Sequence, residues 1–213
     1  MTESGTINDP ILIATYGKET LTKVQTMLTK CKKHGIKLVT AESLTAGGIA
    51  HLLTVLSGSS NMLDRGYVVY NNQAKIDMLG VSADDLKIHE AVSHPVAEQM
   101  VLGALAKSNA QIAVSVTGYS DASGDASRNI PGGTVFIGLA SRKNITDKPK
   151  LVQVAEHHFS TDRTACRRET VEAAIDGLTK AIDQWIGQTP STGCAGALIA
   201  ASTPGAACGR GHA

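Results

Sequence analysis

Ser43 and its neighbours are the part of the sequence best suited to chemistry. Residues 38–48 pass from a short β-branched stretch to small polar residues and glycines, and the apolar residues 49–56 follow. A strand-to-helix turn of this kind leaves backbone N–H groups of the first helical turn free to bind an anion or a developing oxyanion. Ligand chemistry in an open α/β sheet usually occurs where strands end. The pattern predicts a hydroxyl presented there, although Ser43 or Thr45 could instead only cap the helix.

The histidines and cysteines do not have the spacing of a metal site. His157 and His158 would point to opposite faces of a regular strand. His89, Glu90 and His94 lack the His-Glu-x-x-His pattern of zinc proteases. The cysteines are far apart and form no Cys-x-x-Cys pair; they are Cys31, Cys166, Cys194 and Cys208. We therefore predict no metal, no cofactor and no disulfide framework.

Length and composition are those of one folded domain whose core is large enough to need no disulfide or metal for stability. Of the 213 residues, 42% are hydrophobic and 18% charged, which excludes a disordered chain. A net charge of +1 and only 3% aromatic residues argue against a nucleic-acid binder. No stretch approaches the ~20 apolar residues of a membrane span, and no signal peptide is evident. We expect a cytoplasmic protein that binds neither nucleic acid nor membrane.

Alternating apolar runs and turn signals predict the elements that would position Ser43. Residues 111–116 and 134–140 are near-continuous apolar runs, typical of strands buried on both faces, and residues 151–159 could pair antiparallel with the second. The other predicted strands are 37–40 and 66–70, and the predicted helices are 19–34, 45–56, 73–79, 94–107 and 162–186, with a short helical turn at 82–86. This order favours an α/β fold, a three-layer α/β/α sandwich with a mixed, mostly parallel sheet.

The chain divides into three predicted parts. Residues 1–16 have the composition of a loose leader, and residues 17–186 form the folded domain. Residues 187–213 are mostly Gly, Ala, Ser, Thr and Pro with almost no charge, which predicts a disordered tail.

Eight short stretches together resemble one known family. They are residues 40–48 (TAESLTAGG), 58–60 (GSS), 65–75 (RGYVVYNNQAK), 78–81 (MLGV), 91–93 (AVS), 104–106 (ALA), 113–118 (AVSVTG) and 133–135 (GTV). Their order and spacing resemble the C-terminal domain of the competence/damage-inducible protein CinA, whose stand-alone forms are nicotinamide-nucleotide amidases. The resemblance covers residues 17–186.

The resemblance implies hydrolysis of the carboxamide of nicotinamide mononucleotide, giving nicotinate mononucleotide and ammonia without a metal. The family's motif serine falls on Ser43, and its motif lysine falls on Lys75. The remaining motif positions imply substrate binding by Glu42, Thr45, Gly47, Tyr70, Asn72, Thr117, Gly118, Arg163 and Arg167. The implied partners are a small pyridine nucleotide and further copies of the chain in a homo-oligomer.

Elementary chemistry is compatible with these roles. Amide hydrolysis needs an activated nucleophile and a stabilised oxyanion. A lysine can serve as the base if burial lowers its pKa, and the amides of residues 44–46 could hold the oxyanion. Arg163 or Arg167 could bind the phosphate, helped by the N-terminus of the helix predicted at residues 45–56, and Glu42 could face the cationic pyridinium.

Each of these residues also has a structural interpretation. Without the resemblance, Lys75 would be interpreted as a solvated charge on a short helix. Thr117 could simply end a buried strand. Arg163, Arg167 and Arg168 could form the polar face of the last helix.

The loop at residues 119–131 departs from the family pattern. The family usually continues Ile-Ala-Gly-Pro with a glycine-rich loop, whereas this chain has YSDASGDASRNIP. The stretch after Ser43 differs mildly, with Leu44-Thr45-Ala46 where Cys-Thr-Gly-Gly is frequent. Side chains restrict the close backbone approach that glycines permit, and Asp121 and Asp125 would repel a phosphate unless Arg128 offsets them. The alternative hypothesis is therefore a non-catalytic, ligand-binding or oligomer-forming relative.

Overall fold

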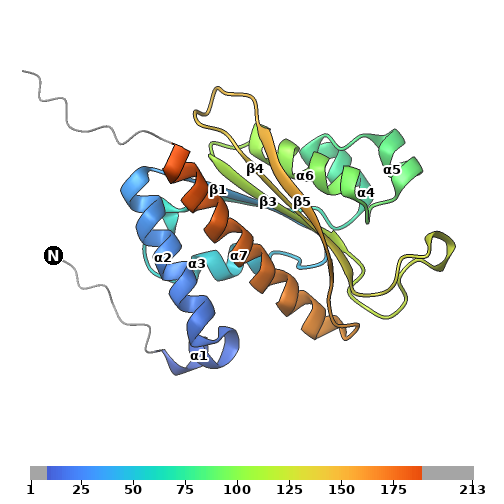
Figure 1. The fold of residues 1–213 in the computed structure, drawn as a ribbon, viewed down its shortest axis with the longest axis horizontal. Helices are drawn as coiled ribbons and strands as arrows, with labels where there is room; N and C mark the ends of the chain where they lie inside the picture. Colours follow the sequence, from blue (N-terminus) through green and yellow to red (C-terminus); the bar gives the residue numbers. More distant parts are fainter. Residues whose placement is uncertain (1–8, 189–213) are drawn as a thin grey trace, which may run out of the picture.

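The computed structural model describes residues 9–188 and contains one five-stranded sheet. Its strands are β1 (Leu38–Glu42), β2 (Leu63–Val68), β3 (Ile112–Gly118), β4 (Thr134–Ser141) and β5 (Lys150–His158), in the order β2-β1-β3-β4-β5 (Figure 1). β1 pairs in parallel with β2 and β3, while β4 is antiparallel to β3 and β5. Only β4 therefore runs against the other strands, and the predicted mixed, mostly parallel sheet is confirmed.

Helices cover both faces of the sheet (Figure 1). One face packs against α2 (Lys18–His34), α3 (Gly48–Thr54) and α7 (Arg163–Gln188). The other packs against α4 (Asn72–Ala74), η2 (Lys75–Leu79), α5 (Ala83–His89) and α6 (His94–Ala106). Two short 3₁₀ segments, η1 (Ser59–Asn61) and η3 (Ala126–Arg128), lie in connections. Apolar strand residues alternate between the two cores, so the three-layer sandwich is confirmed.

The N-terminal segment differs from its prediction. Within the predicted loose leader, Pro10–Tyr16 forms a helix, α1. The Asp9 carboxylate accepts hydrogen bonds from the backbone N–H groups of Ile11 and Leu12, and proline occupies the first turn. Leu12, Ile13 and Tyr16 pack against the α2/α7 core. The predicted tail at residues 187–213 lies outside the described residues except for Gly187 and Gln188, which continue α7.

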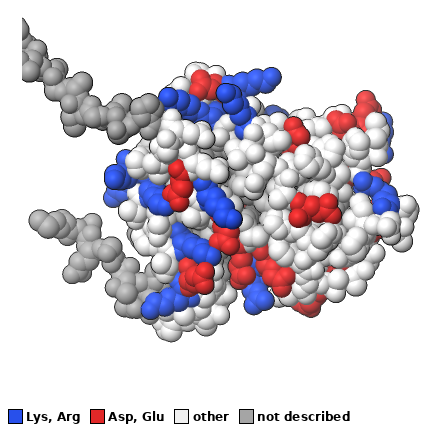
Figure 2. All heavy atoms as spheres, in the orientation of Figure 1, with Lys and Arg blue, Asp and Glu red and all other residues white. Residues whose placement is uncertain are grey.

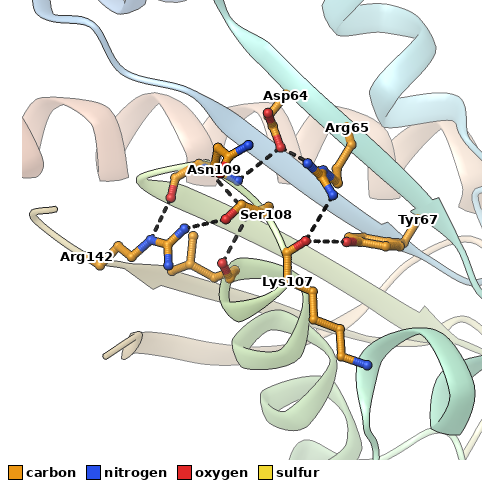
Figure 3. A network of polar contacts seen from close by, with 9 residues as sticks. Asp64, Arg65, Tyr67, Lys107, Ser108, Asn109 and Arg142 are labelled. Atoms are coloured by element: carbon orange, nitrogen blue, oxygen red, sulfur yellow. Dashed lines mark hydrogen bonds and ion pairs between the residues drawn. The ribbon is translucent and has the colours of Figure 1, made fainter. Parts of the chain in front are cut away.

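A polar network fixes the edge of the sheet opposite Ser43 (Figure 3). The buried Arg142 guanidinium donates to three backbone carbonyls: Nε to Ala110 (2.8 Å), Nη1 to Ile145 (2.7 Å) and Nη2 to Ser108 (2.7 Å). Arg65 and Tyr67 both donate to the Lys107 carbonyl, at 3.1 and 2.7 Å. The start of β2, the start of β3 and the end of β4 are thereby joined.

The charged surface is mixed in sign. Acidic and basic side chains lie interspersed on the face that α2 and α7 form (Figure 2), and two ion pairs, Lys23–Asp176 and Lys30–Asp183, join these helices. Among residues 9–188, no helix is long and apolar enough to cross a membrane.

Candidate active site

Ser43 lies at the carboxyl end of β1, as the sequence predicts. Its backbone N–H donates to the Val116 carbonyl of β3 (3.0 Å), which fixes the start of the turn. Ala46 and Gly47 both have left-handed backbone conformations, with φ of 51° and 94°. A glycine at position 47 adopts this conformation without steric cost. The sharp reversal starts α3 directly behind Ser43.

Glu42 holds this turn from the α3 side. Its buried carboxylate accepts four hydrogen bonds, from Thr40 Oγ1 (3.0 Å), Thr45 Oγ1 (2.7 Å) and the backbone N–H groups of Ile49 (3.0 Å) and Ala50 (2.9 Å). The first-turn amides of α3 are therefore occupied by the chain's own carboxylate. This corrects the expectation that the helix N-terminus is free for an anion, and it places Glu42 beneath the turn, with its carboxylate engaged in holding it.

Other amides of the turn remain available. Ala46 N–H donates to the Ser43 carbonyl (3.2 Å) and Gly48 N–H to the Thr45 carbonyl (3.0 Å). The N–H groups of Leu44, Thr45 and Gly47 donate no hydrogen bond within the described chain. The predicted oxyanion donors at residues 44–46 therefore reduce to Leu44 and Thr45.

Lys75 approaches Ser43 from the opposite face of the sheet. It starts η2, a π-helical segment that follows α4, and such segments are frequent at functional sites. Its Nζ lies 3.3 Å from Ser43 Oγ, 2.9 Å from the Val69 carbonyl and 3.2 Å from the Tyr70 carbonyl. The side chain is only 1% exposed. The interpretation of Lys75 as a solvated surface charge is therefore wrong.

Burial gives this lysine unusual acidity. Desolvation lowers the pKa of Lys75 to about 8, and no carboxylate of the described chain lies within ion-pair distance of it. A neutral amine has two N–H donors and one lone pair. The Val69 and Tyr70 carbonyls can accept the two donors, which leaves the lone pair for the Ser43 hydroxyl proton. The arrangement can deprotonate Ser43.

Two arginines of α7 border the site. Arg163 donates from Nη2 to the Tyr70 hydroxyl (3.0 Å) and pairs through Nη1 with Asp121 Oδ2 (3.2 Å). Arg167 donates from Nη2 to the Thr45 carbonyl (3.1 Å). Because Thr45 belongs to the Ser43 turn, α7 contacts both the turn and the end of β2.

Three further residues that the resemblance assigns to substrate binding are Thr117, Gly118 and Asn72. Thr117 is buried, and its hydroxyl donates to the Ala91 carbonyl (2.8 Å). A β-carbon at Gly118 would lie 2.7 Å from the Thr134 carbonyl oxygen, so only glycine fits this close pairing. Asn72 is an exposed first residue of α4, whereas the neighbouring Asn71 caps that helix by accepting from Ala74 N–H (2.7 Å).

The fold thus gathers Ser43, Lys75, Tyr70, Thr45, Arg163 and Arg167 around one edge of the sheet. The Val69 and Tyr70 carbonyls and the Asp121–Arg163 pair were not predicted. Arg163, rather than Arg128, pairs with Asp121. The sequence marks Asp121 as an acidic residue in a loop where the family has glycines, but nothing local to the loop marks Arg163, 42 positions away, as its partner. Among residues 9–188, no three His, Cys, Asp or Glu side chains lie close enough to hold a metal ion.

Comparison with known proteins identifies the family of this chain. A family model of the CinA C-terminal domain matches residues 20–182. The chain belongs to the CinA C-terminal domain family. The nicotinamide-nucleotide amidohydrolase PncC of Escherichia coli K12 is 38% identical over 149 residues, covering 69% of this chain and 85% of that protein. The resemblance predicted from the motifs is confirmed.

Other CinA relatives differ in length. A protein of Caldicellulosiruptor saccharolyticus, named as competence-damage inducible, is 41% identical over 167 residues, or 78% of this chain. The present chain spans only 39% of that relative. The crystal structure of the competence/damage inducible protein CihA from Agrobacterium tumefaciens matches with a TM-score of 0.68 at 36% identity, covering 78% of this chain and 96% of that one.

Proposed function

We propose that this chain is an amidohydrolase that converts nicotinamide mononucleotide to nicotinate mononucleotide and ammonia. The observation that carries the proposal is the buried Lys75 amine, 3.3 Å from Ser43 Oγ, with its pKa lowered to about 8. A substantial neutral fraction near pH 8 makes this amine a base matched to its task. The similarity to the amidohydrolase PncC supports the substrate class.

The proposed reaction has two halves. Lys75 takes the Ser43 proton as Oγ attacks the carboxamide carbon, and the oxyanion is held by the amides of Leu44 and Thr45. Protonated Lys75 then gives its proton to the amide nitrogen, the C–N bond breaks, and ammonia leaves. Water attacks the resulting ester as Lys75 accepts its proton. Lys75 then gives this proton to Ser43 Oγ as the ester C–O bond breaks, and nicotinate mononucleotide leaves.

Positioning of the nucleotide falls to the α7 side of the site. We assign Arg163 and Arg167 to the phosphate, because guanidinium groups bind phosphate oxygens through paired N–H bonds. Tyr70, two residues beyond β2 and 60% exposed, offers the nucleotide an aromatic ring beside Arg163. Glu42 acts as a positioning residue, since its carboxylate fixes the turn that carries Ser43.

Assembly and compartment complete the proposal. Exposed apolar side chains beside the site, those of Val68, Tyr70 and Met78, support a homo-oligomer. Light scattering of the purified chain tests this, and a monomer at all concentrations would contradict it. The free thiols of Cys31 and Cys166 fit a reducing cytoplasm.

Ammonia release from nicotinamide mononucleotide tests the reaction. We expect release by the wild type and a loss of about 10³-fold or more in Ser43→Ala. Ser57→Ala, which alters an exposed serine beyond α3, is the matched control and should retain full activity. Equal release by wild type and Ser43→Ala would exclude the serine mechanism.

A binding role without turnover is the second candidate, and the altered loop at residues 119–131 favours it because that loop places Asp121, where the family has glycines, against Arg163 at the border of the site. It predicts that folded wild type binds the nucleotide and releases no ammonia.

A further inference from the structure

Arg163 stands at a junction of three segments around Ser43. Its guanidinium contacts the Tyr70 hydroxyl at the end of β2 and the Asp121 carboxylate in the loop at residues 119–131. The Tyr70 carbonyl in turn accepts from Lys75 Nζ. The same arginine that the proposed function assigns to the phosphate thus already holds an anion of the chain itself.

Asp121 is held in place to make this contact. Its Oδ1 accepts from the Ser123 backbone N–H (3.1 Å) and from the Ser123 hydroxyl, which leaves Oδ2 for Arg163. These hydrogen bonds, followed by the charge of Arg163, lower the pKa of Asp121.

The loop that carries Asp121 is closely packed. Tyr119 N–H donates to the Thr134 carbonyl, and Gly133 N–H donates to the Tyr119 carbonyl, both at 2.9 Å. A β-carbon at Gly132 would lie 2.1 Å from the Asp121 carbonyl oxygen. The carboxylate is therefore presented by a folded loop.

We propose that Asp121 competes with the substrate phosphate for Arg163 and so determines how strongly the site prefers phosphorylated over unphosphorylated amides. The inference rests on the proposed function. A phosphate that approaches Arg163 meets a guanidinium that is already paired with the Asp121 carboxylate. The negative charge of that carboxylate also repels the phosphate. An amide without a phosphate meets neither effect. Asp121 thus moderates a preference that Arg163 creates.

The main competing role for Asp121 has the opposite sign. The pyridinium ring of the substrate is cationic, and a carboxylate that contacted it would strengthen binding. Neutralising Asp121 would then weaken binding of every pyridinium amide, whether or not it carries a phosphate. The direction of the change separates the two roles.

The test compares Asp121→Asn with wild type on nicotinamide mononucleotide and on nicotinamide riboside, which lacks the phosphate. Asparagine keeps the acceptor for Ser123 and removes the charge. We expect KM for the mononucleotide to fall about two- to fivefold, the range of an exposed ion pair. Turnover of both amides and KM for the riboside should stay unchanged, because Asp121 contacts neither Ser43 nor Lys75.

Asp125→Asn is the matched control. Asp125 lies in the same loop, but its carboxylate accepts from Ser127 N–H (3.0 Å) and Ser127 Oγ (2.6 Å) as the cap of η3, a role that asparagine fills equally well. It should leave KM for both amides unchanged. A raised or unchanged KM of Asp121→Asn for the mononucleotide, or equal shifts for both amides, overturns the proposal.

A binding measurement separates this proposal from the proposed function. Calorimetry with ribose 5-phosphate on folded wild type and Asp121→Asn needs no catalysis, and tighter binding by the variant, about two- to fivefold, supports the competition. If Asp121→Asn binds ribose 5-phosphate as weakly as wild type or more weakly, or if neither protein binds it detectably, the proposal is overturned. This holds whether or not the wild type releases ammonia. If thermal unfolding shows that Asp121→Asn is misfolded, Asp121→Gly takes its place.

Discussion

Two buried cations, at opposite edges of the same sheet, have similar surroundings and different chemistry. Lys75 lies at the carboxyl edge of β1 and is 1% exposed, and Arg142 lies at the other edge and is 6% exposed. Both donate to backbone carbonyls, and neither has a carboxylate of the described chain within ion-pair distance. Desolvation lowers the pKa of both groups.

The difference follows from the two side chains. A guanidinium starts from a pKa so high that it stays charged even when buried, so Arg142 can only donate. A lysine amine starts from 10.5 and reaches about 8, so Lys75 exchanges a proton near neutral pH. Similar burial therefore produces a permanent hydrogen-bond donor that stabilises the fold at one edge and a base at the other.

The largest expected effect comes from Lys75→Met, which removes the amine and keeps the side-chain length. Because the variant has no base for Ser43, we expect ammonia release to fall about 10³-fold. Lys87→Met, which alters an exposed lysine on α5, should retain activity. Retention of more than about a tenth of the wild-type rate would mean that Lys75 is not the base.

The same variant has a defined stability signature. The folded-state pKa of Lys75 lies below that of the unfolded chain, so burial of the charged amine costs stability fully below about pH 8. This cost disappears as pH rises from about 8 to 10.5. The melting temperature of wild type should therefore gain on that of Lys75→Met across this range.

Arg142→Met tests the other edge of the comparison. Removal of the guanidinium leaves three carbonyls without their donor, and we expect the free energy of unfolding to fall by about 3 kcal/mol or more. Urea unfolding measures this, with Lys143→Met as an exposed control. Since Arg142 is at the far edge, turnover by the remaining folded protein should be unchanged. A specific loss of turnover without destabilisation would contradict the assignment.

The dependence of kcat/KM on pH tests the role of Lys75 as a base in the unmodified protein. Because Lys75 must be neutral to act, kcat/KM should rise with pH and level off above about 8. At pH 7 it should be about tenfold below the plateau. A profile that is flat between pH 6.5 and 9 would exclude a base with this pKa.

Tyr67→Phe should have the smallest effect. It removes one of the two donors to the Lys107 carbonyl, and Arg65 keeps the other (Figure 3). We expect the free energy of unfolding to fall by about 1 kcal/mol or less. A change as large as that of Arg142→Met would show that the network acts as one unit.

Much of the fold could be predicted because its signals are local. The apolar run at 111–116 predicts β3, and the left-handed glycine at position 35 predicts the end of α2. Both signals depend only on residues that are neighbours in the chain. The Asp9-Pro10 pair is also such a signal, and it was missed at α1.

The chemistry of the site depends on long-range contacts. Glu42 caps residues seven and eight positions ahead of it, and Lys75 reaches Ser43 across 32 positions. An amphipathic pattern at residues 73–79 does not distinguish a surface α-helix from a buried π-helical turn. Only the family motif marked Lys75, and nothing in the sequence marked the hydrogen bonds of Arg142 to backbone carbonyls.

The π-helical turn at Lys75–Leu79 makes the length of this segment as important as its composition. Each residue of a regular helix advances the side-chain direction by about 100°, and a π-turn accommodates one residue more than an α-turn. In a deletion library, the loss of any single codon from Ile76 to Leu79 would pull this turn back to α-helical register. Either Lys75 would rotate away from Ser43 or Leu79 would leave the core, so the segment should tolerate substitution far better than shortening.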